Sequence, residues 1–140
     1  MYRFFLVCVA AICMIAFLSC NVHTNTWSVY ATSFRILLDS LQDVTLLDVR
    51  TEEEWKKGVI GQPVMMDYYR SDFKQKVLGL PKNKPIFIYC HSGYRSQKTR
   101  KWLLRNGYSE VYDLREGVLG WKKSGFSTNN TDILPFQESK

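Results

Sequence analysis

The residues best suited to chemistry lie in a short loop that follows an apolar run. Residues 85–89 (PIFIY) are apolar, Cys90 comes directly after them, and Gly93, Arg95 and Ser96 follow within six residues. A loop that turns from a strand into a helix aims backbone N–H groups and the positive end of the helix dipole at such a cysteine. A neighbouring guanidinium lowers the pKa of the thiol further. The pattern therefore predicts a nucleophilic thiolate at Cys90.

We expect the six residues after this cysteine to bind its substrate. Gly93 lets the backbone curl tightly, and Ser96 can cap the following helix or donate to a bound anion. His91 either tunes the thiolate or faces solvent. The alternative to the reactive interpretation is that Cys90 is a small buried hydrophobe at the end of a strand. The predicted substrate-binding residues are His91, Ser92, Gly93, Tyr94, Arg95 and Ser96.

The elements around this loop follow an alternating order. With 140 residues, 46% of them hydrophobic, the chain has room for one compact domain. Short apolar runs alternate with helical patterns, which is typical of an α/β domain with a mainly parallel sheet. Because ligands bind at the carboxyl ends of parallel strands, this order puts Cys90 where a site is expected. We predict about five strands flanked by helices, with strands at 44–49, 63–66, 86–89 and 110–113 and a first strand near 28–30.

Three helices are expected between the strands. Residues 33–41 place apolar side chains at helical spacing, so this helix should pack on the sheet. Thr51 and Glu54 match a capping box, in which each side chain satisfies a backbone N–H at a helix start. A third helix should begin near Ser96 and end at Gly107, where a left-handed residue is favoured.

The first twenty residues differ from the rest of the chain. Residues 4–18 are all apolar, which is short for a membrane-spanning helix but matches the central region of a signal peptide. The sequence FLSC at 17–20 is similar to a bacterial lipobox, although Phe17 stands where Leu is usual. We expect residues 1–19 to be a signal peptide and a lipidated Cys20 to be the mature N-terminus. The protein would then be exported and membrane-anchored in the cell envelope, on the periplasmic side; an ordinary cleaved signal and an uncleaved anchor are the alternatives.

The remaining chain divides simply. Residues 20–27 are predicted to be a tether, 28–126 the domain, and 127–140 a flexible tail without periodicity. The net charge of +6 suits either an anionic membrane surface or substrate, or a solvated basic face. No nucleic-acid-binding motif is recognisable, so we expect no nucleic acid partner.

The cysteine count supports a free thiol at Cys90. Cys8 and Cys13 would leave with the signal, and Cys20 would carry lipid, so no cysteine remains to form a disulfide with Cys90. Only two histidines are present and no two cysteines sit at ligand spacing, so we expect no metal and no cofactor.

Several motifs together resemble the rhodanese family. Its active loop reads Cys-x-x-Gly-x-Arg followed by Ser or Thr, as Cys90 to Ser96 do. Residues 47–60, with Asp48, Arg50 and Glu54-Trp55, look like the family's first signature, and residues 114–121 resemble its closing Gly-Gly-x-x-x-Trp segment. The resemblance covers residues 28–126 and implies a single rhodanese-like domain. The departures from the pattern are Val59 for His, Glu116 for the first closing glycine, and Thr99-Arg100 for small alanines.

The resemblance implies a sulfurtransferase. Cys90 would attack the outer sulfur of a small anionic donor such as thiosulfate, form a persulfide, and pass the sulfur to a thiophilic acceptor. Asp48 and Arg50 would support the loop through hydrogen bonds. The basic run Lys98, Arg100, Lys101 and Arg105 would steer anionic donors or simply form an exposed helix face.

Three other functions are open at this point. A cysteine phosphatase or arsenate reductase also places a cysteine before an arginine, but its loop reads Cys-x5-Arg, whereas Cys90 and Arg95 are separated by four residues. A noncatalytic module could use the same fold to bind a partner. A carrier could hand its persulfide to a protein rather than to a small molecule.

Overall fold

The computed structural model describes residues 26–129, which form one α/β domain. Five parallel strands make a single sheet in the order β1-β5-β4-β2-β3. This confirms the predicted fold class. The strands are β1 (Thr26–Val29), β2 (Thr45–Asp48), β3 (Val64–Met65), β4 (Ile86–Tyr89) and β5 (Val111–Leu114).

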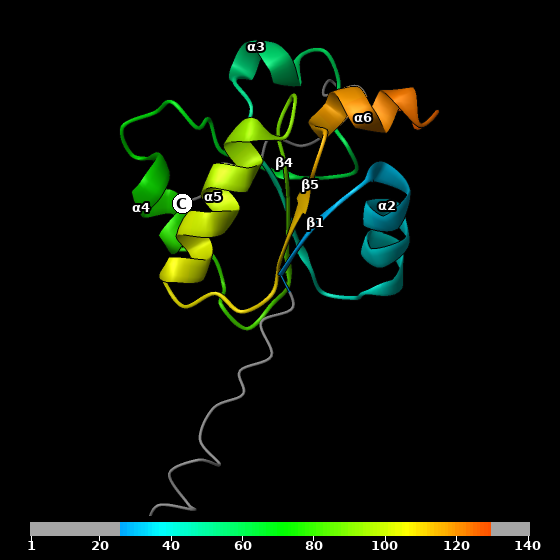
Figure 1. Cartoon of the computed structure of the whole chain (residues 1–140). Coiled ribbons are helices and arrows are strands. Elements are labelled where there is room, and N and C mark those ends of the chain that lie inside the picture. The colour runs from blue at the N-terminus through cyan, green and yellow to red at the C-terminus, as the bar shows by residue number, and fades with distance from the viewer. Residues whose placement is uncertain (1–25, 130–140) are drawn as a thin grey trace, which may run out of the picture.

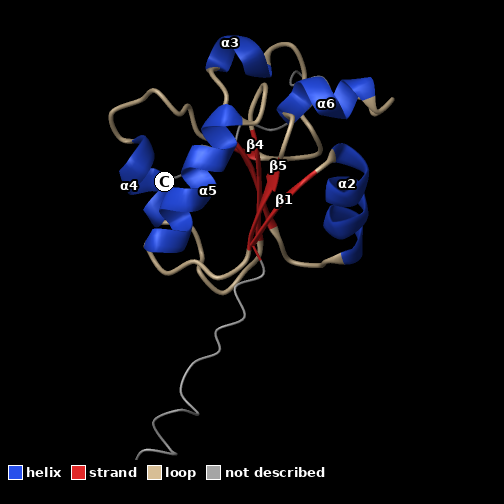
Figure 2. Cartoon of the chain, in the orientation of Figure 1, coloured by secondary structure: helices blue, strands red, loops and turns tan. Residues whose placement is uncertain are grey.

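Helices cover both faces of the sheet (Figures 1 and 2). On one face lie α4 and α5, and on the other lie α2 and α6, while α3 sits at the carboxyl end of the strands. Burial on both faces explains why all four residues of β4 are apolar. The helices are α2 (Ala31–Ser40), α3 (Glu52–Trp55), α4 (Phe73–Leu78), α5 (Tyr94–Arg105) and α6 (Gly117–Lys123).

Each face of the sheet has its own core. Alternate residues of β4 point to opposite sides, as the period of a strand requires. Ile86 and Ile88 pack under α4 and α5, whereas Phe87 packs with Phe34 of α2 and Trp121 of α6. The two helical layers therefore hold β4 in the centre of the sheet. They also fix the position of Cys90, the residue that follows β4.

The local helix predictions are largely confirmed. The helix predicted at 33–41 is α2, and the one predicted after Arg50 is α3, where the Thr51 N–H donates to the Glu54 carboxylate at 2.9 Å to form the capping box. The helix predicted to begin near Ser96 starts two residues earlier, at Tyr94. Ser96 is therefore in its first turn and is not its cap. The cap position belongs to Gly93, whose φ of 92° a residue with a Cβ rarely adopts.

The ordered contacts extend beyond the predicted domain bounds of 28–126. Strand β1 begins at Thr26, two residues inside the predicted tether. At the other end, Asn129 forms an antiparallel bridge with Val59, and the Trp121 side chain donates to the carbonyl of Ser127. The first residues of the predicted tail thus pack on the domain because their backbone groups find partners there.

The predicted signal peptide 1–19, Cys20, the tether up to residue 25 and residues 130–140 lie outside the described residues. Among residues 26–129, no helix has the length and apolar character that crossing a bilayer requires.

Candidate active site

Cys90 lies at the carboxyl end of the central strand. It directly follows β4, and three residues separate it from α5. Its side chain continues the alternation of Ile86 and Ile88 and belongs to the core cluster under α4 and α5. The register pairs Asp48 of β2 with Tyr89 of β4, so the chain after β2 runs next to the loop. Two segments about 40 residues apart in the sequence are thereby brought to one site.

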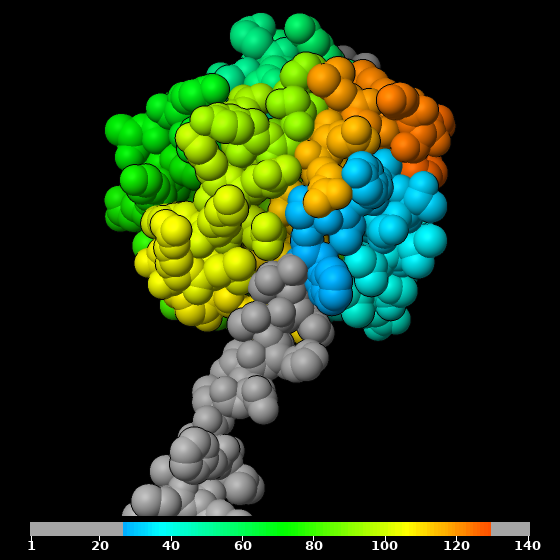
Figure 3. Space-filling view, in the orientation of Figure 1, coloured from blue at the N-terminus to red at the C-terminus, as the bar shows by residue number. Residues whose placement is uncertain are grey.

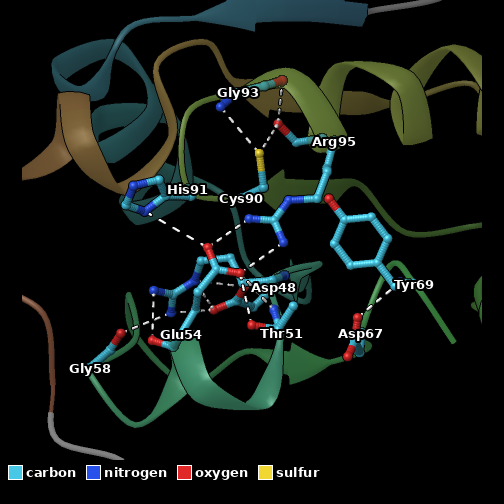
Figure 4. A network of polar contacts seen from close by, with 12 residues as sticks. Asp48, Thr51, Glu54, Gly58, Asp67, Tyr69, Cys90, His91, Gly93 and Arg95 are labelled. Carbon is cyan, nitrogen blue, oxygen red and sulfur yellow. Dashed lines mark hydrogen bonds and ion pairs between the residues drawn. The ribbon is translucent and has the colours of Figure 1, made fainter.

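The sulfur of Cys90 has two polar neighbours (Figure 4). The Gly93 N–H donates to Sγ at 3.1 Å, and the Ser96 hydroxyl lies 3.6 Å away. The Ser96 hydroxyl donates its own proton to the Gly93 carbonyl at 3.0 Å. It can therefore accept from the Cys90 thiol, and on ionisation it can rotate to donate to the thiolate. The first turn of α5 thus offers the sulfur both an N–H and a hydroxyl.

The loop is more closed than the sequence predicts. Cys90 is 0% exposed, as expected for a small buried hydrophobe. It also lies in the loop between a strand and a helix, as expected for a nucleophile. The sequence predicts several backbone N–H groups on the sulfur, but within residues 26–129 a single one, that of Gly93, donates to it. The carbonyls of Cys90 and His91 face away and accept from α6 instead. A substrate can reach Sγ only if neighbouring side chains move.

Helix α6 supports the loop from behind. The N–H groups of Val118 and Leu119 donate to the carbonyls of Cys90 and His91 at 2.9 and 3.1 Å. Gly117 has a φ of 58°, and a Cβ there would lie 2.4 Å from the Cys90 carbonyl oxygen. A side chain at this position would push the loop outward. The closing motif was recognised in the sequence, but its hydrogen bonds to the loop were not predicted.

Arg95 does not present a free guanidinium to the sulfur. Its two terminal nitrogens donate to the two oxygens of Glu54 at 2.8 and 2.7 Å, and its guanidinium carbon lies 5.6 Å from the centre of the Tyr69 ring. The sequence predicts Arg95 as a positive neighbour of the thiolate, and in the structure this charge is also paired with the carboxylate that α3 supplies. Glu54 was predicted only as a helix cap; its separation of 41 residues from Arg95 gave no local signal.

The Glu54 carboxylate accepts hydrogen bonds from both Thr51 and Arg95. Partial burial works against its charged form, but hydrogen bonds from Arg95 and Thr51 lower its pKa from 4.5 to about 2. The His91 Nδ1 atom lies 3.8 Å from the same carboxylate. Glu54 is thus ionised at neutral pH, and it joins α3 to the loop.

Asp48 and Arg50 form a second, buried pair beneath the first. The Arg50 Nη2 atom donates to Asp48 at 2.6 Å and to the Gly58 carbonyl at 2.8 Å. Nη1 donates to the Glu54 carbonyl at 3.1 Å, and the Arg50 side chain is only 2% exposed. These bonds tie the end of β2 to the backbone of α3 and the turn after it.

The other predicted substrate-binding residues line the outside of the loop. His91 and Ser92 are exposed, and Tyr94 is 64% exposed with the Lys98 ammonium 4.4 Å from its ring centre. Of the six residues predicted to bind substrate, the structure brings Gly93, Arg95 and Ser96 inward. It leaves the other three at the surface.

The departures from the family pattern have local structural explanations. Val59 is fully buried and its backbone pairs with Asn129. Glu116 has a φ of −105°, so this position does not require glycine. Thr99 donates to the Arg95 carbonyl at 2.9 Å, and Arg100 forms an ion pair with buried Asp113. Arg100 is therefore engaged in the fold rather than available for steering.

No cluster of three or more His, Cys, Asp or Glu side chains suited to a metal ion occurs among residues 26–129. The reactive groups that the structure places at the loop are the sulfur of Cys90, the hydroxyl of Ser96 and the Arg95 guanidinium.

Comparison with known proteins identifies the class of this fold and loop. The family model for the rhodanese-like domain matches residues 32–124, so the chain belongs to the rhodanese-like domain family. A rhodanese-related protein from Thermoplasma volcanium has a similar structure, with a TM-score of 0.62, 24% identity, and coverage of 71% of this chain and 94% of that one. That likeness supports the fold.

Curated relatives bear on the activity. The chain is 32% identical over 88 residues to a protein named sulfurtransferase from Allochromatium vinosum, covering 63% of this chain and 80% of the relative. It is 28% identical over 82 residues to the thiosulfate sulfurtransferase GlpE of Coxiella burnetii, covering 58% and 74%. It is also 30% identical over 84 residues to the tRNA uridine(34) hydroxylase of Buchnera aphidicola, covering 57% of this chain but only 27% of that longer protein. The relatives support the sulfurtransferase family and differ in the substrates that their names give.

Proposed function

We propose that this protein is a sulfurtransferase that carries sulfane sulfur as a persulfide on Cys90. The observation that carries the proposal is the placement of Cys90 at the carboxyl end of a central parallel strand, with the Gly93 N–H donating to its sulfur at 3.1 Å. A buried structural cysteine has no need of such a donor. The relatives named sulfurtransferase support the same class.

The reaction consists of two displacements. The Cys90 thiolate attacks the outer sulfur of thiosulfate, a new S–S bond forms, and the original S–S bond breaks with its electron pair leaving on sulfite. A thiophilic nucleophile then attacks the outer sulfur of the persulfide, and the Cys90 thiolate leaves. The sulfur changes carrier twice without any external oxidant or reductant, so no cofactor is required.

The loop stabilises charge at both steps. The Gly93 N–H, the Ser96 hydroxyl and the amino end of α5, a helix of 12 residues, all favour a negative charge on Sγ. Arg95 is positioned to contact the anionic donor once its pairing with Glu54 loosens. Because Cys90 is fully buried, entry of the donor requires neighbouring side chains to move, and in this proposal the Glu54–Arg95 pair is the one that opens.

Thiosulfate-to-cyanide transfer tests the proposal. Wild-type protein should turn over, and Cys90→Ser should lose all activity because the persulfide cannot form. Mass spectrometry should show a gain of about 32 Da on the wild type after thiosulfate and none on Cys90→Ser. Ser124→Ala, at an exposed position after α6 and outside the loop, is the matched control and should keep the mass gain. Absence of the mass gain on folded wild-type protein would overturn the proposal.

A noncatalytic binding module is the second candidate. The complete burial of Cys90 favours it, because a sulfur that never meets solvent cannot react. The rate at which iodoacetamide labels Cys90 in the native protein separates the two. Labelling that is faster than global unfolding indicates that the loop opens, and supports the enzyme. Labelling that occurs only at the rate of global unfolding supports the binding module.

The N-terminal segment supports a further proposal on location. The apolar run 4–18 followed by Ser19-Cys20 favours export and lipidation at Cys20, with the domain tethered to the membrane of the cell envelope. A labelled fatty acid should attach to the wild type and not to Cys20→Ala. If both variants take up label equally, or neither does, lipidation at Cys20 is wrong.

A further inference from the structure

A groove lies between α4 and α5, on the same face of the sheet as Cys90. It has a volume of about 400 Å³, in the range of small-molecule sites. Figure 3 shows these two helices, in green and yellow-green, side by side on one face of the molecule. Nothing in the two displacements described above uses this groove.

The groove combines an aromatic floor with a basic rim. Tyr68, Phe73 and Trp102 line it from the side of the core, and all three belong to or pack against the cluster that contains Cys90. Arg70, Lys74 and Lys98 line it from the solvent side and are exposed. In the described part of the chain, no acidic residue lines it, and beside the groove Asp72 pairs with Arg70 at 3.4 Å, which leaves Lys74 and Lys98 as the main positive charges of the rim. Its chemistry therefore suits a ligand with a flat apolar body and a negative charge.

Aromatic contacts connect the groove to the active loop. The Tyr68 ring packs against Phe73 at 5.2 Å and against Tyr69 at 5.4 Å, and the Tyr69 ring lies beside the Arg95 guanidinium. On the other wall, the hydroxyl of Thr99 donates to the Arg95 carbonyl, one helical turn from the loop. The groove is thus joined to the Arg95 guanidinium through the Tyr68 and Tyr69 rings.

We propose that this groove binds the sulfur acceptor, and that the acceptor is an anionic organic thiol with an aromatic or similarly flat body. The inference rests on the proposed sulfurtransferase function. A small inorganic donor has no carbon skeleton for an aromatic floor to contact, whereas the acceptor in the second displacement can have one. The thiolate of the acceptor attacks the outer sulfur of the Cys90 persulfide, forms an S–S bond, and releases the Cys90 thiolate with the electron pair of the bond that breaks.

Calorimetry tests the binding without turnover. The probe is 3-sulfanylbenzoate, titrated into the folded Cys90→Ser protein so that no disulfide or persulfide can form at position 90. We expect saturable binding that the Lys74→Gln and Lys98→Gln changes each weaken by up to about fivefold, the size of a partly exposed charge pair. The neutral 3-sulfanylbenzyl alcohol should bind more weakly than the benzoate. Lys101→Gln, an exposed position of α5 outside the groove, is the matched control and should leave the affinity unchanged.

Acceptor kinetics test the coupling to transfer. The measured quantity is kcat/KM for 3-sulfanylbenzoate divided by kcat/KM for the small neutral thiol 2-sulfanylethanol in the same variant. Lys74→Gln should lower this ratio and Lys101→Gln should not. Three results would each overturn the inference. The charged and neutral probes could bind with equal affinity, or Lys74→Gln and Lys101→Gln could weaken binding equally. The probe could also bind while Lys74→Gln leaves the kcat/KM ratio unchanged. If wild-type protein forms no persulfide, the proposed function is wrong. Calorimetry on Cys90→Ser does not depend on persulfide formation, so it tests ligand binding in the groove separately.

Discussion

Two arginine–carboxylate pairs lie close together at the carboxyl end of the sheet, and they differ in what surrounds them. Arg50 and Asp48 are 2% and 0% exposed and lie two residues apart in one segment. Arg95 and Glu54 are 10% and 22% exposed and join two elements 41 residues apart. The first pair fixes the scaffold permanently, because neither charge can return to water. The second pair lies where water can replace either partner, so it should open more readily than the first.

Breaking the buried pair should have the largest effect. Arg50→Met leaves the Asp48 carboxylate buried without the guanidinium that pairs with it, and should lower the free energy of unfolding by about 3–5 kcal/mol. Urea denaturation followed by circular dichroism measures the change. A loss no greater than that of Glu54→Gln would show that the two pairs are equivalent, contrary to this comparison.

Breaking the outer pair should cost less stability and open the site. Glu54→Gln removes the charge-assisted bonds to Arg95 and part of the capping box. This should lower the free energy of unfolding by about 1–2 kcal/mol. Because Arg95 is then released, iodoacetamide should label Cys90 faster than in the wild type. Glu53→Gln, an exposed neighbour on α3, is the control and should label at the wild-type rate. Slower or equal labelling in Glu54→Gln contradicts an opening role.

The lowered pKa of Glu54 predicts an acid dependence. Because the folded pKa lies near 2 and the usual value is 4.5, the carboxylate contributes stability that is complete above pH 4.5 and is lost as the pH falls toward 2. Thermal unfolding of the wild type should therefore shift to lower temperature over this window. The shift should be smaller in Glu54→Gln, and an equal shift in both proteins would assign it to other groups.

An exposed ion pair should contribute least to the stability of the fold. Arg35 and Asp39 form an exposed pair on α2, with side chains about half exposed. Arg35→Gln should change the free energy of unfolding by less than about 0.5 kcal/mol, because solvent screens the pair. A larger loss would mean that exposure does not rank these pairs.

The parts of the fold that were predictable have strong local signals. Strand β4 was predicted at its observed bounds because burial on both faces makes every residue apolar. Helix α3 was predicted from the capping box, whose two partners lie three residues apart. Helix α4 was not predicted, since six residues carry too little periodicity, and α6 was recognised only as a family motif.

The amino-acid sequence by itself determined the α/β alternation, the place of Cys90 at the end of a buried strand, and the short-range motifs around it, because these depend on residues within one or two turns of each other. Only the tertiary structure decided that Glu54 neutralises Arg95, that α6 holds the back of the loop, and that Cys90 is covered. Each of these depends on contacts between segments distant in the sequence. Such contacts exist only once the sheet has set its strands side by side, and no local pattern encodes which partner a charged or backbone group will meet there.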